Sequence, residues 1–160
     1  MTVRIGIDVG LSGAIAAIVD GVAHSVRDMP VTLDGKSRSV SPALLAGLLR
    51  EIVETAKPDE RPTVYIERVG SMPKQGVVST FNFGKSAGVA EGVVGALGLQ
   101  YRLVTPQVWK RKANLLNKPK DASRALAIAL FPEVSGCLTR KADDGRADAL
   151  LLAHFGAEVS

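Results

Sequence analysis

Two carboxylates stand beside apolar segments, where an ionised side chain is costly. Asp8 lies inside the alternating stretch 3–9, and Glu67 ends the apolar run 64–66. Burying a charge that has no partner is strongly unfavourable, so each of these residues needs a reason to be there. Taken singly, Asp8 also fits the cap of a turn, and Glu67 also fits an ordinary strand end.

A second pair of carboxylates lies near the end of the sequence. Asp148 is the single charged residue in the apolar segment 147–153, and Asp144 stands four residues before it. Four helical residues turn by about 400°, so the two side chains share one face. Asp144 alone fits an acid that complements the dipole at a helix N-terminus, as Asp143 does. The same geometry turns Asp143 about 140° away from Asp148.

Together the four carboxylates predict a site for hard divalent ions. Asp and Glu oxygens without Cys or His clusters suit Mg²⁺ or Mn²⁺. The sequence has one cysteine, Cys137, and its two histidines, His24 and His154, stand far apart. An intramolecular disulfide and a cysteine-based zinc site are therefore excluded. The carboxyl ends of strands are also where α/β sheets usually place their sites.

The elements that must position these residues follow from periodicity and turn signals. Residue alternation and the Asp20-Gly21 turn predict a three-strand meander, and later apolar runs predict two further strands. Ser-Pro and Thr-Pro pairs predict two helix starts. The predicted strands are 3–9, 14–19, 22–28, 64–67 and 101–104; the helices are 42–57, 77–97, 106–109, 119–130 and 143–155; residues 29–40 and 68–76 are predicted loops.

This order, three strands followed by alternating helices and strands, predicts an α/β fold with a parallel crossover attached to an antiparallel meander. The chain has 160 residues, of which 46% are hydrophobic and 22% are charged, so we expect one globular domain over 1–160. The longest nearly apolar run, 87–99, is shorter than the roughly 20 residues that span a bilayer. The first residues lack a signal-peptide layout, so we expect a cytoplasmic protein and no membrane partner.

The charge is divided unevenly along the chain. The net charge is +4, yet residues 1–67 carry seven basic and nine acidic side chains, and residues 121–160 carry four and six. Residues 68–120 carry nine basic side chains against Glu91 alone. A basic segment is often no more than a solvated face, but five cations between Lys110 and Lys120 without an acid fit phosphate contacts better.

An ordered set of motifs resembles the RuvC-type Holliday junction resolvases, most closely their short phage-encoded forms. The resemblance covers nearly the whole chain and rests on IGIDVG at 5–10, YIE at 65–67, QGVVSTFNFG at 75–84, PQVWK at 106–110 and DDGRADALL at 143–151. It implies a ribonuclease H-like fold, a five-stranded mixed sheet in which an antiparallel three-strand meander is joined by two parallel strands and flanked by helices. It also implies a homodimer that cuts opposed strands of a four-way DNA junction, with helix 77–97 at the dimer interface.

The resemblance also implies roles for the acids. Asp8, Glu67 and Asp148 match the metal-binding carboxylates of that family, and Asp144 takes a fourth place where members carry Asp or His. We therefore expect two-metal phosphodiester hydrolysis with two Mg²⁺ ions per site, replaceable by Mn²⁺. The expected products are 5′-phosphate and 3′-hydroxyl ends, and no nucleotide cofactor is expected.

The expected DNA contacts come from the basic middle of the chain. The expected set is Lys74, Gln75, Phe81, Lys85, Lys110, Lys112, Lys118 and Lys120. Lys110 or Lys118 is expected near the scissile phosphate. Aromatic residues are mostly core residues, but Phe81 or Phe83 also fits a wedge that unstacks bases at the crossover.

Three other interpretations remain open. IGIDVG with Ser12-Gly13 also resembles the phosphate-binding hairpin of the sugar kinase and actin superfamily, although 160 residues hold only one of the two domains needed to enclose ATP. A nuclease of structured RNA or other branched nucleic acids would keep the fold and change the substrate. A non-catalytic junction-binding module would need neither metal nor the acids. The phage resemblance places the expected protein in the cytoplasm of a bacterial or phage-infected cell.

Overall fold

The first three strands form an antiparallel meander, and a two-residue hairpin turn joins the second strand to the third. The computed structural model describes residues 2–56, 60–70 and 76–159. Strands β1 (Val3–Asp8), β2 (Ala14–Val19) and β3 (Val22–Asp28) are antiparallel neighbours. Between β2 and β3, Asp20 and Gly21 both have positive φ, 50° and 84°, as a two-residue hairpin turn requires. The predicted hairpin is confirmed.

Two parallel strands extend the meander into a five-stranded sheet. Strand β6 (Thr63–Glu67) pairs in parallel with β1, and β7 (Gln100–Val104) pairs in parallel with β6. The strand order is β3-β2-β1-β6-β7, which confirms the predicted mixed sheet. Because β1 and β6 run side by side in the same direction, their carboxyl ends lie at one edge of the sheet.

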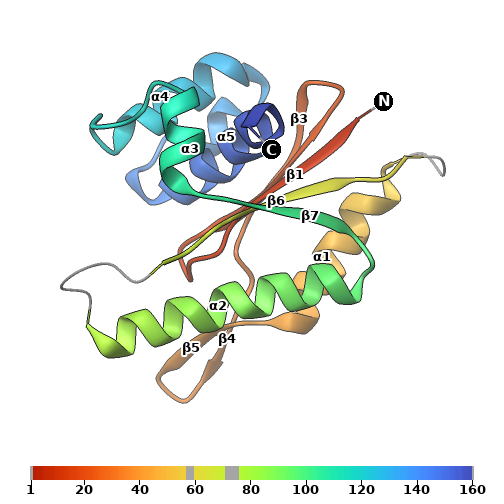
Figure 1. The fold of residues 1–160 in the computed structure, drawn as a ribbon, viewed down its shortest axis with the longest axis vertical. Coiled ribbons are helices and arrows are strands. Elements are labelled where there is room, and N and C mark those ends of the chain that lie inside the picture. Colours follow the sequence, from red (N-terminus) through yellow and green to blue (C-terminus); the bar gives the residue numbers. More distant parts are fainter. Residues whose placement is uncertain (1, 57–59, 71–75, 160) are drawn as a thin grey trace.

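Helices cover both faces of this sheet (Figure 1). Helices α1 (Pro42–Glu54) and α2 (Val77–Ala96) lie on one face, and α3 (Pro106–Lys112), α4 (Asp121–Leu130) and α5 (Asp144–Val159) lie on the other. Alternation in β1 assigns its side chains: Ile5 and Ile7 are fully buried toward α1 and α2. Asp8 therefore projects toward α5.

The helix boundaries follow the predicted signals with small shifts. The Ser41 hydroxyl accepts a hydrogen bond from the Leu44 amide at 3.3 Å, which caps α1. Helix α4 begins at Asp121 rather than 119, and α5 begins at Asp144 and continues to Val159. Short 3₁₀ segments, η1 (Pro132–Cys137) and η2 (Lys141–Asp143), fill the connection between them. No helix in the described part of the chain is long and apolar enough to cross a membrane.

Residues 29–40 differ from the prediction. They form a hairpin of β4 (Val31–Asp34) and β5 (Ser37–Val40), not a loop, and this hairpin is separate from the main sheet. Gly35 takes the positive φ of its turn, 59°, and the Ser41 amide donates to the Pro30 carbonyl at 2.9 Å to close its base. Most of the hairpin is exposed, and its strands carry mainly polar side chains. They therefore lack the alternation of apolar and polar residues that predicts a strand.

Candidate active site

The site begins where β1 and β6 end. Ile7 pairs with Ile66 in the parallel register, so Asp8 and Glu67, the final residues of the two strands, emerge at the same edge. Alternation directs both carboxylates to the face of the sheet that α5 covers. The local sequence therefore places two of the four predicted carboxylates side by side.

Helix α5 brings the other two carboxylates because it packs directly on β1. At Gly6, a Cβ would overlap the carbonyl oxygen of Ala149 and lie 2.7 Å from the amide nitrogen of Ala153. At Gly145, a Cβ would meet the backbone of the β1–β2 turn at Ser12. Both positions must lack a side chain for the helix backbone to approach this closely. Because the helix lies this close to β1, Asp144 and Asp148 line the same cleft as Asp8.

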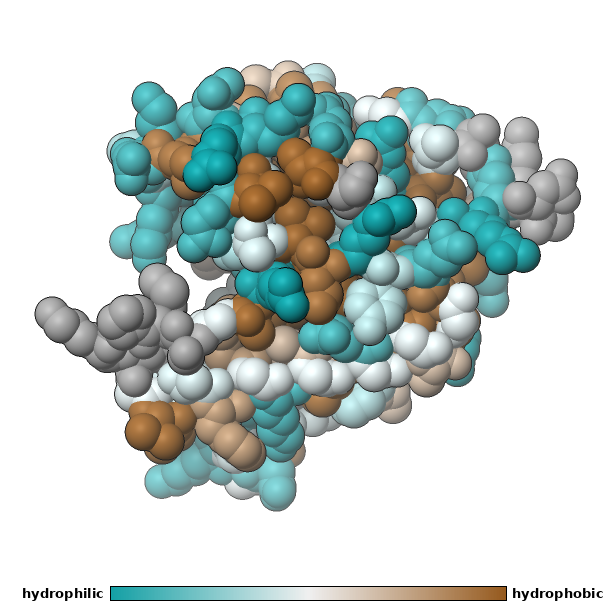
Figure 2. All heavy atoms as spheres, viewed as in Figure 1, coloured by the Kyte–Doolittle hydropathy of each residue, from teal (hydrophilic) through white to brown (hydrophobic). Residues whose placement is uncertain are grey.

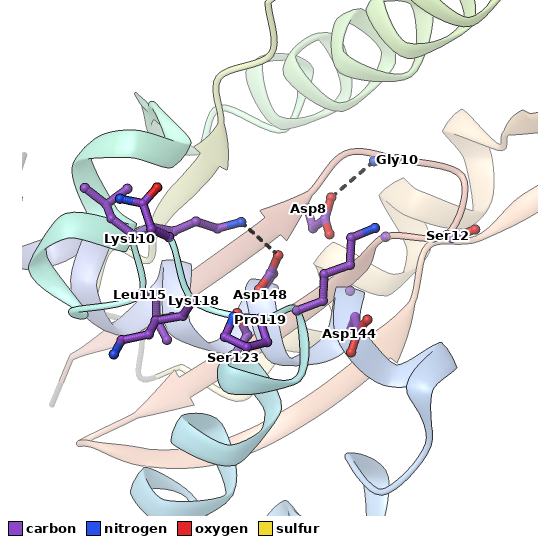
Figure 3. Close-up of a pocket in the computed structure, with 15 residues that line it drawn as sticks. Asp8, Gly10, Ser12, Lys110, Leu115, Lys118, Pro119, Ser123, Asp144 and Asp148 are labelled. Carbon is purple, nitrogen blue, oxygen red and sulfur yellow. Dashed lines mark hydrogen bonds and ion pairs between the residues drawn. The ribbon is translucent and has the colours of Figure 1, made fainter. Parts of the chain in front are cut away.

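A cleft of about 470 Å³ opens over these residues (Figure 3). Its wall includes the carboxylates Asp8, Asp144 and Asp148. The ammonium-bearing side chains that share the wall are Lys110, Lys118 and Lys120. Glu67 does not line this cleft and instead borders a second cavity of about 440 Å³, which Phe83 and Pro106 also line.

The carboxylates perturb one another and are poorly hydrated. The pKa of Asp8 is raised to about 7, first by burial and then by the charges of Glu67 and Asp148. Burial also raises the pKa of Glu67 and of Asp148. Such mutual repulsion at one place costs stability, and it is typical of a site that binds a cation or performs chemistry.

Each of the other carboxylates has a separate cationic or hydrogen-bonding partner. The indole N–H of Trp109, a fully buried side chain, donates to Glu67 Oε1 at 3.1 Å. Lys110 Nζ lies 3.5 Å from Asp148 Oδ2 (Figure 3). Arg124 Nε donates to Asp144 Oδ1 at 2.7 Å, and its Nη1 reaches the Thr139 carbonyl at 3.4 Å.

The donor set fits a hard divalent cation. Asp148 Oδ1 is buried and has no hydrogen-bond partner in the described part of the chain. An ionised oxygen in that position is strongly unfavourable unless a cation or donor reaches it. The cleft wall brings carboxylate oxygens of Asp8, Asp144 and Asp148 together, the ligand type that Mg²⁺ and Mn²⁺ prefer. As the side chains stand, no three His, Cys, Asp or Glu residues among residues 2–56, 60–70 and 76–159 converge closely enough to hold a metal ion.

The predicted DNA-contact residues fall in different places. Lys112 points away from the cleft wall and pairs with Glu158 at 3.2 Å. Lys85 is exposed on α2, and Phe81 on the same helix is 69% exposed. Phe83 is half-buried against the core beneath α2. Lys74 and Gln75 lie outside the described residues.

Arg124 and Ser123 were missed by the sequence reasoning. Ser123 is buried in the cleft wall, and Arg124 holds Asp144 as described above. Arg124 carried a usable signal, because it is the single charge in the apolar segment 122–130. The argument applied to Asp148 applies equally to a cation in such a segment. Asn117, also in the wall, offered no signal beyond its polar loop.

Comparisons with solved structures place the fold. No protein-family model matches the chain. The T. thermophilus RuvC in complex with a Holliday junction substrate has a TM-score of 0.64 and 16% identity, and the match covers 99% of this chain and 96% of that one. A second Thermus thermophilus RuvC structure has a TM-score of 0.55 and 13% identity, with 98% and 96% covered. The resemblance to RuvC-type resolvases is thereby confirmed, and these structures establish the fold.

A curated relative corrects one expectation. The chloroplastic Holliday junction resolvase MOC1 of Chlamydomonas reinhardtii is 37% identical over 92 residues. The match covers 57% of this chain and 10% of that protein, so the chain spans about a tenth of its relative's length. Because this relative is chloroplastic, the predicted location in the cytoplasm of a bacterial or phage-infected cell is contradicted.

Proposed function

We propose that this chain is a structure-selective, Mg²⁺-dependent DNA endonuclease that resolves four-way (Holliday) junctions and leaves 5′-phosphate and 3′-hydroxyl ends. The observation that carries the proposal is a single cleft whose wall combines three carboxylates with three lysines. A phosphodiester is an anion, so acidic ligands for cations and basic side chains for phosphates belong together in a nuclease site.

The relatives support the choice of substrate. MOC1 is a Holliday junction resolvase, and one matched RuvC structure is a complex with a Holliday junction substrate. A four-way junction is therefore proposed ahead of a linear duplex. Within the same superfamily, a nuclease of structured RNA would use the same cleft, so the substrate must be tested directly.

The carboxylates supply the proposed ligands. Asp8, Glu67, Asp144 and Asp148 would hold two Mg²⁺ ions, which Mn²⁺ can replace. Bound there, such ions lower the pKa of an attacking water and stabilise the charge that develops on the phosphate and the leaving oxygen. Asp8 is the central ligand in this proposal because Glu67 and Asp148 both act on its pKa.

Neighbouring side chains orient these ligands. The Trp109 indole fixes one oxygen of Glu67, and Trp109 is itself held in the core. Arg124 fixes one oxygen of Asp144. Partners that fix the orientation of ligands are a regular part of metal sites and tune their affinity.

Lysines balance the charge of the cleft. Lys110 Nζ lies near Asp148 and 5.1 Å from the centre of the Trp109 ring, so its ammonium offsets part of the repulsion between the carboxylates. Lys118 and Lys120 stand on the segment before α4 and line the same cleft as Asp8. We propose that these three ammonium groups neutralise phosphates of the bound strand.

Helix α2 supplies the proposed dimer interface. Its N-terminal end exposes Val77, Val78 and Phe81, which are 86%, 73% and 69% exposed. A Cβ added at Gly84, Gly88, Gly92 or Gly95 would meet nothing within 4 Å. Figure 2 shows the result as a pale band along α2 that ends in apolar side chains. Such a face allows a second backbone to approach closely, and a homodimer would present two clefts to the two opposed strands of a junction.

Cleavage of a synthetic junction tests the proposal. Each strand of a four-way junction is end-labelled in turn and incubated with the protein in Mg²⁺ or EDTA, and the products are mapped on denaturing gels. Asp8→Asn and Asp148→Asn are expected to reduce cleavage by at least about a hundredfold, because each removes a charged ligand. Glu51→Gln, an exposed carboxylate on α1, is the matched control and is expected to cut normally.

Undiminished cleavage by Asp8→Asn or Asp148→Asn would refute the assignment of the site. Linear duplex, flap and RNA hairpin substrates are compared in the same assay. Faster cutting of the RNA hairpin would transfer the function to structured RNA. Saturable ATP binding in calorimetry would favour the sugar kinase and actin interpretation, which the proposed nuclease does not predict.

A further inference from the structure

A further hollow, separate from the cleft and from the cavity beside Glu67, lies between the β4–β5 hairpin and helix α2. It is lined by the following residues: Leu11, Ser37, Arg38, Ser39, Val40, Asn82, Lys85, Ser86 and Val89. We call this set the hairpin groove. Its existence depends on the hairpin, whose strand β5 packs beside α2.

The polar lining of the hairpin groove is basic and neutral, and it contains no carboxylate. Arg38 and Lys85 are both exposed, and neither forms an ion pair within the described part of the chain. Ser37 and Ser39, the neighbours of Arg38 in β5, also line the groove. The Ser86 hydroxyl is already used, since it donates to the Asn82 carbonyl at 3.0 Å. Cations with hydroxyl and amide groups are the side chains that contact phosphates in protein–DNA complexes.

The lining of the groove favours phosphate over base. Arg38 and Lys85 supply cationic donors, and the residues that line the groove include no aromatic side chain on which a base could stack. Contacts of this kind position a strand and carry no sequence information.

The hairpin groove adjoins the catalytic cleft through the β1–β2 turn. Leu11 lines the groove, while its neighbours Gly10, Ser12 and Gly13 line the cleft. Figure 3 shows this turn at the border of the cleft, beside Asp8. A strand that passes the carboxylates can therefore continue over the turn to Arg38 and Lys85.

We propose that the hairpin groove binds the sugar–phosphate backbone of the nucleic acid beyond the cleaved bond, with Arg38 and Lys85 each neutralising one phosphate. The inference rests on the proposed nuclease function and adds Arg38 and the whole β4–β5 hairpin to its DNA surface. An acidic protein partner would need the same cations. It is disfavoured by the continuity of the groove with the cleft.

Salt dependence of binding tests the groove. Affinity for a four-way junction is measured in EDTA over a range of salt concentrations for the full chain and for Arg38→Ala/Lys85→Ala. Each lost phosphate contact lowers the slope of log K against log salt by about 0.9, so the double variant is expected to lose about 1.8. Arg50→Ala/Arg61→Ala is the matched control. It removes the same charge from α1 and from the segment just before β6, and it is expected to keep the slope.

Three outcomes overturn the inference: an unchanged slope in the groove variant, an equal loss in the control, or no junction binding by the natural chain. A change of oligomeric state with an unchanged slope would assign the groove to a protein interface instead. Arg38→Lys/Lys85→Arg retains both charges and is expected to restore the slope. If the groove variant loses slope while the natural chain does not cut any substrate, the proposed function fails and the groove stands.

Discussion

Asp143 and Asp148 are neighbouring carboxylates that differ in their hydrogen-bond partners. Asp143 is almost fully buried, and it accepts from the Arg140 amide at 2.8 Å and from the Arg140 guanidinium at 2.7 Å. These bonds hold the pKa of Asp143 below its usual value. Asp148, five residues later, keeps a buried oxygen without a partner in the described chain. Asp143 is thus a structural residue, and Asp148 has the properties of a ligand.

At this residue scale, the proposed ligands should destabilise the protein when no metal is bound. Asp8→Asn removes a buried charge that is repelled by Glu67 and Asp148. In EDTA, we expect the variant to gain about 1–2 kcal/mol in the free energy of unfolding, which raises Tm by about 3–6 °C for a chain of this size. Thermal unfolding followed by circular dichroism measures the shift, with Glu51→Gln as the neutral control. A lower Tm for Asp8→Asn would show that the carboxylate supports the fold.

At the scale of elements, contact between α5 and β1 sets the site. The two elements approach until the Ala149 carbonyl and the Ala153 amide lie against Gly6. Helix α5 carries Asp144 and Asp148, so the distance between the α5 and β1 backbones sets how far these two side chains lie from Asp8. A side chain at Gly6 would lift this helix away from the sheet.

Gly6→Ala is accordingly expected to cost about 2–4 kcal/mol of stability, because neither backbone can yield to the added methyl group. Gly47→Ala is the matched control, since a Cβ there meets nothing within 4 Å in the middle of α1. It should gain roughly 0.5–1 kcal/mol from the better helix propensity of Ala. Urea unfolding of both variants measures the difference. Equal stabilities would contradict the close packing of α5 on β1.

The β4–β5 hairpin is the element that periodicity missed. Asp34-Gly35 is the same kind of turn signal as Asp20-Gly21, which was recognised. The strands of the second hairpin, β4 and β5, are mostly polar and exposed, so they show no apolar alternation. Strand β2 in the first hairpin is apolar and almost entirely buried, so its pattern predicts a strand. Burial of Val40 and contact with α2 stabilise it, and both are long-range effects.

At the scale of the whole molecule, the cleft joins charges of opposite sign from different parts of the chain. The proposed acidic ligands come from the first and last parts of the chain, and the lysines come from the basic segment 68–120. Lys112 belongs to the same segment yet pairs with Glu158, so a sum over sequence cannot tell which cations face the substrate. Only the packing of α3 against α5 makes that distinction.

The proposed dimer is also a property of the whole molecule. Gly88→Leu/Gly92→Leu adds bulk to an exposed face of α2, where an added Cβ meets nothing within 4 Å, so the variant should fold. We expect its mass in solution, measured by light scattering, to fall to that of one chain, because the added side chains hold a second α2 away. Ala43→Leu, on the exposed face of α1, is the control and should keep the mass of the natural protein. A natural protein that is already monomeric at micromolar concentration would contradict the proposal.

The sequence by itself determined the sheet, most helix boundaries and the positions of Asp8, Glu67 and Asp148, because each depends on a local pattern. Alternation assigns strand faces, Ser-Pro starts a helix, and a lone charge in an apolar segment is visible without any partner. Each of these signals involves only a few neighbouring residues, so it can be recognised without knowing the tertiary contacts.

Only the tertiary structure decided which partner each charge has. Three of these pairs join residues far apart in the sequence: Arg124 with Asp144, Trp109 with Glu67, and Lys110 with Asp148. Their separations are 20, 42 and 38 positions. The first two pairs are hydrogen bonds and the third is an ion pair. The fold also decided that Lys112 pairs with Glu158 outside the cleft and that Arg38 and Lys85 line one groove. Such pairings depend on the balance between desolvation and attraction at one point in space, and that balance exists only once the helices have packed on the sheet.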